Sequence, residues 1–158
     1  MTAMKALTLA AAFLAAGAAF AHTDEYLDTQ KSPNGGQLRM AGAYHFELVV
    51  AKDAKEAAES PVVIYVTDHA GAKVPTAGAV ATATLLSGKT KASVVLAPDG
   101  DNRLKGSARY AANPDLKAVV SITLSGKAAE QARFTPLAAP KAAPAAAVAT
   151  DGHKGHMH

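Results

Sequence analysis

Short apolar or alternating runs, separated by turn residues, recur along the chain between Gly35 and Phe134. Such runs, bounded by glycine, proline, asparagine and aspartate, are typical of β-strands joined by turns. Seven or eight strands at a spacing of roughly ten residues predict an all-β fold: a single small antiparallel β-sandwich of immunoglobulin-like type, with a small barrel as the alternative. The predicted strands are 37–40, 43–51, 62–67, 80–86, 91–96, 104–108, 118–124 and 131–134, with 72–75 as an extra edge.

Two loops can be predicted in more detail. The segment LLSGKTKASVVL predicts a tight hairpin around Ser87-Gly88, because glycine adopts the positive φ that a primed turn requires. Residues 53–60 have some helical preference, but their place between two strands predicts a turn or loop.

Both ends of the chain differ in composition from this body. Residues 1–21 have the layout of a secretory signal peptide, with Lys5, an apolar stretch rich in alanine and leucine, and the small-x-small ending Ala19-Phe20-Ala21. Cleavage there would release a periplasmic chain that begins at His22 and is not inserted in the membrane; an uncleaved anchor is the alternative. We therefore predict a signal peptide (1–21), a polar, mobile leader (22–34), the β domain (35–134) and a disordered Pro/Ala-rich tail (135–158).

The composition argues against several classes of function. The sequence has no cysteine, which excludes a disulfide framework, a thiolate metal site and a cysteine nucleophile. Signal cleavage removes one of the 16 basic residues and none of the 13 acidic ones, and no basic cluster follows a path suited to phosphates, so nucleic acid is not the expected partner. No nucleophile elbow, phosphate loop or HExxH motif occurs, and we predict that the protein is not an enzyme.

A histidine and a glutamate lie two apart in the strand GAYHFELVV. Side chains alternate along a strand, so the apolar Phe46 and Leu48 face the core while His45 and Glu47 point away from it. An imidazole and a carboxylate at this spacing could converge on one cation if a third ligand lay nearby. A solvated surface pair is the alternative.

Other donors strengthen the metal hypothesis. His22, as an N-terminal residue, would offer an amine and an imidazole to copper, and Met40 would offer a soft thioether on the preceding strand. His69 is interpreted as a passenger in a turn, with a ligand role less favoured. The tail ends in a short His-rich tract, which is typical of metal capture. Its predicted ligands are His153, His156, Met157 and His158.

Parts of the chain resemble small exported proteobacterial proteins associated with copper or other heavy metals. The resemblance lies in three segments and in the strand before ARF; the segments are GGQLRMAGAYHFELVV, PVVIYVTDHAGAKVPTAGAVATATLLSGK and LAPDGDNRLKGSARY. They are also similar to the small periplasmic β domain of some membrane-fusion subunits of metal-efflux pumps of the resistance-nodulation-division class. The resemblance covers most of residues 35–134 and matches most closely at Gly35, Gly36, His45 and Glu47. It implies a compact β-sandwich in metal handling. Asn34 stands where several such sequences have histidine, and the coiled-coil and lipoyl segments of a full adaptor are missing.

The sequence therefore predicts a periplasmic metal-binding protein that buffers ions or delivers them to a metal-efflux pump or metallochaperone. Copper, as Cu²⁺ or Cu⁺, is favoured by the donor set, with zinc or nickel as alternatives. The competing hypothesis is an envelope interaction module that docks a partner through a strand edge or face and binds no metal.

Overall fold

The computed structural model describes residues 23–139. The predicted signal peptide, His22 and the His-rich tip lie outside this range. Within it, no helix has the length and apolar character needed to cross a membrane. The elements are α1 (Asp24–Thr29), β1 (Gln37–Ala41), β2 (Tyr44–Val50), β3 (Ala58–Asp68), β4 (Val80–Ser87), β5 (Thr90–Pro98), β6 (Arg103–Tyr110), β7 (Lys117–Thr123) and β8 (Ala129–Phe134).

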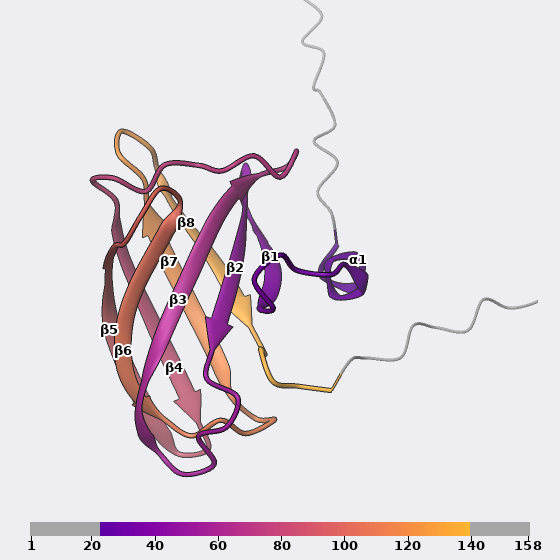
Figure 1. Cartoon of the computed structure of the whole chain (residues 1–158), viewed down its shortest axis with the longest axis vertical. Helices are drawn as coiled ribbons and strands as arrows, with labels where there is room; N and C mark the ends of the chain where they lie inside the picture. Colours follow the sequence, from indigo (N-terminus) through magenta and orange to yellow (C-terminus); the bar gives the residue numbers. More distant parts are fainter. Residues whose placement is uncertain (1–22, 140–158) are drawn as a thin grey trace, which may run out of the picture.

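The eight strands form one nearly closed sheet in the order β1-β2-β3-β6-β5-β4-β7-β8, and every neighbouring pair is antiparallel. Figure 1 shows the strands curling around a shared interior, with α1 beside β1. The prediction of an all-β antiparallel domain is confirmed. The predicted hairpin is also confirmed, since Ser87 pairs with Thr90 and Gly88 has a φ of 59°.

Strand β5 connects the group β1, β2, β3 and β6 to the group β4, β7 and β8. It pairs with β4 from Thr90 to Leu96, and its last residues, Ala97 and Pro98, pair with β6. The two strands approach closely at Gly106 of β6, where an added Cβ would lie 2.7 Å from Val94 Cγ2 and 2.8 Å from the carbonyl oxygen of Val95. Only glycine fits there without moving backbone atoms, so Gly106 sets the spacing of β5 and β6.

The first and last strands of the order, β1 and β8, meet through side chains. In the part of the chain described, no strand ladder joins them. At one end, the backbone N–H of Thr135 donates a hydrogen bond of 2.8 Å to Gln37 Oε1. At the other end, the Glu130 carboxylate packs against Gly42 in the β1–β2 turn. These contacts hold the seam together without a backbone ladder.

Alternating side chains fill the interior. On β2, Phe46 and Leu48 are fully buried, as the alternation predicts. Tyr110 closes one end of the core, where its hydroxyl donates to the carbonyl oxygen of Pro61 at 2.6 Å and accepts from the N–H of Ala51 at 3.0 Å. Burying a side chain the size of phenylalanine stabilises a fold by about 2–3 kcal/mol, so this apolar interior supplies most of the stability of a domain without disulfides.

The leader contains a short helix, which the prediction of a mobile segment did not include. Thr23 caps α1, its hydroxyl accepting from the N–H of Tyr26 at 3.2 Å, and Leu27 is the buried residue of the helix. Arg39 of β1 holds the helix in place: its Nη1 lies 2.7 Å from Asp28 Oδ1, and the Arg39 side chain is only 8% exposed. A six-residue helix is unstable alone, so these tertiary contacts explain why it forms.

Candidate metal centre

Glu47 points away from the core, as predicted, but the alternative of a solvated surface pair is wrong for this residue. The residue is 3% exposed because the turn at residues 33–36 folds over it. Glu47 Oε1 accepts from the backbone N–H groups of Asn34, at 2.8 Å, and Gly36, at 2.9 Å. Glu47 Oε2 accepts from Asn34 Nδ2 at 2.8 Å. The carboxylate therefore holds a turn against the sheet.

The glycine of this turn explains how it comes so close. An added Cβ on Gly36 would clash with the carbonyl oxygen of Leu48, and it would lie 2.9 Å from Val49 Cγ2. Gly36 thus lets the turn lie flat on β2, where its donors reach Glu47. These contacts account for Gly36 and Glu47, two of the residues highlighted in the sequence, through packing and hydrogen bonding. Coordination by Glu47 stays a prediction, and it would require the carboxylate to give up some of these donors.

His45 has a second predicted ligand directly beside it. In the antiparallel register His45 is opposite Met40 of β1 on one side and Thr67 of β3 on the other. Directly opposite residues project from the same face of a sheet, with Cβ atoms roughly 5 Å apart. Met40 and His45 are both partly exposed on the outer face. The structure therefore places an imidazole and a thioether side by side.

A second imidazole comes from the turn after β3. The ring of His69 stacks on that of His45, with centroids 5.1 Å apart and planes inclined by 26°. Asp68 fixes this turn, because its Oδ1 accepts from the N–H groups of Ala70, at 2.9 Å, and Ala72, at 2.8 Å. The prediction that His69 lies in a turn agrees with these bonds, but the same turn presents His69 to His45. This position makes His69 a candidate ligand that the sequence interpretation did not favour.

The distance between the two rings fits a shared ion. Two imidazole nitrogens bound at roughly 2.0 Å to one tetrahedral ion place their ring centroids about 5 Å apart. Because the rings are now stacked, their nitrogens would converge only after the rings turn about the Cβ–Cγ bonds, which are soft torsions. Within residues 23–139, no three histidine, cysteine, aspartate or glutamate side chains are grouped closely enough to hold a metal. A third protein donor in this region would therefore be the Met40 thioether.

A cavity of about 240 Å³ adjoins this cluster on the same face of the sheet. Its lining includes Glu47 and Tyr65, which are directly opposite one another in the register, and Thr67, the neighbour of His45. Lys73, which pairs with Thr67 through an isolated bridge, lines the side nearest the His69 turn. The two imidazoles do not line the cavity, but Thr67 and Lys73 place it next to them.

The remaining predicted ligands lie outside the described residues, so their relation to this cluster stays a prediction. They are His22, His153, His156, Met157 and His158.

No protein-family model matches the chain, and searches of curated proteins and of solved structures also found no match. The likeness to domains of metal-efflux membrane-fusion proteins therefore remains a resemblance of sequence segments.

Proposed function

We propose that the chain is a periplasmic metal-binding protein, with copper favoured, that buffers ions or delivers them to a metal resistance or efflux system. The observation that carries this proposal is the pairing of the His45 and His69 rings at 5.1 Å, with Met40 directly opposite His45. Two of these residues were candidate ligands in the sequence, and the third is brought to them by the fold.

The donor set favours copper over harder metals. Imidazole binds Cu²⁺ and Zn²⁺ well, whereas a thioether favours Cu⁺. The sequence has no cysteine to compete as a thiolate ligand. Since a protonated imidazole cannot coordinate, affinity should fall as the pH is lowered.

The predicted tail tip would act as a second capture site. A flexible tether of roughly 20 residues keeps its end within a few tens of ångströms of the domain and so raises the local ion concentration there. In this scheme the tip collects ions, and the cluster of His45, His69 and Met40 holds one of them.

Calorimetric titration of the full mature chain with Cu⁺, Cu²⁺, Zn²⁺ and Ni²⁺ tests the proposal. A double variant, His45→Gln with His69→Gln, removes both imidazoles of the cluster. A matched triple variant replaces His153, His156 and His158 with glutamine and leaves the cluster intact. We expect the double variant to lose at least about tenfold in affinity for one equivalent of copper, as the loss of two nitrogen ligands requires. The tip variant should bind fewer ions in total but should still bind that one equivalent of copper.

Unchanged copper binding in the double variant would overturn the role of the cluster. If the full mature chain itself binds none of the four ions, the chain fits the competing hypothesis of an interaction module. The open backbone edges of β1 and β8 favour that second candidate, since the described residues form no ladder across the seam.

A further inference from the structure

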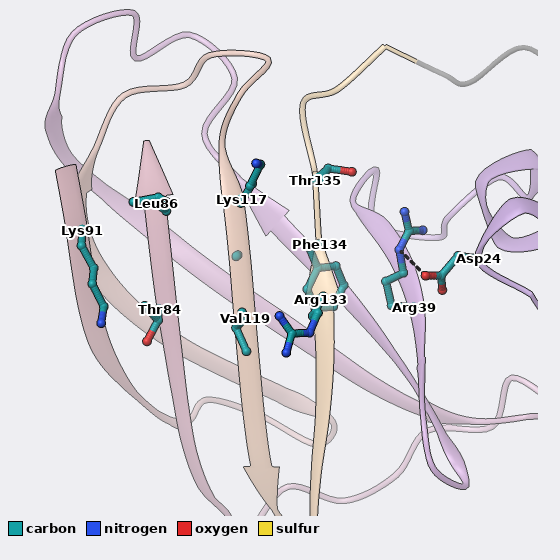
Figure 2. A pocket seen from close by; sticks show the side chains of 11 residues that line it. Asp24, Arg39, Thr84, Leu86, Lys91, Lys117, Val119, Arg133, Phe134 and Thr135 are labelled. Atoms are coloured by element: carbon teal, nitrogen blue, oxygen red, sulfur yellow. Dashed lines mark ion pairs between the residues drawn. The ribbon is translucent and has the colours of Figure 1, made fainter. Parts of the chain in front are cut away.

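A second cavity, of about 640 Å³, lies away from the candidate metal centre, on the face formed by β5, β4, β7 and β8. It shares no lining residue with the cavity beside Glu47. Figure 2 shows its side chains rising from these four strands, with Asp24 and Arg39 at the far end. Its volume is in the range of small-molecule sites, roughly 300–1,000 Å³.

Besides Arg39, three cations line this cavity, each from a different strand: Lys91 of β5, Lys117 of β7 and Arg133 of β8. Lys91 and Lys117 are both opposite Leu86 of β4, so their backbones are about 10 Å apart. Arg133 is opposite Val119, which makes it a diagonal neighbour of Lys117 at roughly 7–8 Å. In Figure 2 the Arg133 side chain extends toward Val119.

These cations lack compensating carboxylates. Among the residues that the structure describes, none of the three is within ion-pair distance of an acid. Asp24 is the one acidic residue in the lining, and it already pairs with Arg39 at 3.6 Å. The cavity therefore has a positive rim whose charge is not neutralised by the described part of the chain.

The floor between the cations is apolar. Leu86 is 41% exposed, and covering an exposed leucine side chain is favourable in free energy. Val119 and Phe134 continue this floor toward β8. A compact inorganic anion would reach one or two of the cations and leave the floor uncovered. An anion with an apolar body would pair with the cations and also cover the apolar floor.

We propose that this cavity, which we name the cationic groove (Leu86, Lys91, Lys117, Val119, Arg133), binds a small organic anion with an apolar body. A carboxylate, sulfonate or phosphate monoester head would lie among the three cations, and the body would cover Leu86 and Val119. Because exposed ion pairs each contribute little, the apolar contact is needed for measurable affinity. This inference does not depend on the metal-binding proposal.

The test is a fluorescence titration of the full mature chain with 1-anilinonaphthalene-8-sulfonate, followed by competition. The charge variant is Lys117→Gln with Arg133→Gln. The matched control, Lys89→Gln with Lys127→Gln, removes the same charge from two exposed turns. We expect affinity for the probe to fall at least about fivefold in the charge variant and less than about twofold in the control. All four positions are exposed, and thermal unfolding followed by circular dichroism checks that each variant is folded.

Competition identifies the class of ligand. Decanoate should displace the probe, whereas decyltrimethylammonium and inorganic phosphate at equal concentration should not. The proposal is overturned if the chain does not bind the probe, if the charge variant and its control bind it equally, or if the cationic amphiphile competes as well as decanoate. Stronger competition by polyglutamate than by decanoate would also overturn it, because that result describes a charged docking face for an acidic protein.

Discussion

Replacing Glu47 with alanine tests the finding that this carboxylate is structural. The change removes the acceptor for three hydrogen bonds, two from Asn34 and one from Gly36. It also leaves a void beneath the turn at residues 33–36. Gly36 fits tightly against Leu48 and so fixes the position of the turn over β2. The donors of the turn therefore cannot easily reach other acceptors on the sheet.

The magnitude follows from which donors water can reach. A buried donor left without a partner costs about 1–3 kcal/mol. Asn34 is exposed, so both of its donors can turn to water at small cost, whereas Gly36 is only partly exposed. We therefore expect Glu47→Ala to lower the free energy of unfolding by about 2–3 kcal/mol. Glu47→Gln keeps one oxygen for the two backbone donors and should cost about 1 kcal/mol.

Urea unfolding followed by far-ultraviolet circular dichroism measures this difference. With a slope of about 1–1.5 kcal/mol per molar urea, the midpoint should fall by roughly 2 M for Glu47→Ala and by less than about 1 M for Glu47→Gln. Glu59→Ala is the control, since Glu59 is exposed on β3. A midpoint for Glu47→Ala that matches the control would refute the reasoning and return Glu47 to the status of a solvated residue.

Three further predictions concern the scaffold. Burial raises the pKa of Tyr110 above its ordinary value of about 10, so the unfolded chain loses this proton first and stability falls as the pH rises past about 10. Tyr110→Phe should remove that part of the fall when urea midpoints are measured against pH. At neutral pH the substitution should lower the free energy of unfolding by about 1–2 kcal/mol. Gly106→Ala should lower the urea midpoint by at least the equivalent of about 2 kcal/mol, because its Cβ would meet Val94 and Val95, while Ser107→Ala changes it little. Asp28→Asn should speed amide hydrogen exchange in α1 more than Asp24→Asn does, since Asp28 makes the shorter and less exposed pair with Arg39; equal rates in the two variants would contradict this.

Strand positions could be predicted well from the sequence because alternation and turn residues are local signals. All eight predicted strands occur, with ends shifted by cross-strand pairing. β3, for example, begins at Ala58 rather than at residue 62, because its first residues pair with β6, Glu59 with Arg109. Residues 72–75 form no strand and keep only the bridge between Lys73 and Thr67.

The candidate site was less predictable because it depends on contacts between segments. The sequence correctly indicated that His45 and Glu47 share an outward face, but only the three-dimensional arrangement shows the turn that buries Glu47. His69 stacks on His45 because of the register of β2 with β3 and the turn held by Asp68. Helix α1 was missed for the same reason, since its stability comes from Arg39 rather than from its own sequence.

The most direct test of the central claim is a nuclear magnetic resonance titration of the imidazole nitrogens of the full mature chain with Cu⁺ under anaerobic conditions. We predict that the ring nitrogens of His45 and His69 shift together and reach their end point at the same equivalent of metal, with the Met40 methyl signal moving alongside them. Shifts confined to His22, His153, His156 and His158, with His45 and His69 unchanged at saturation, would contradict the account.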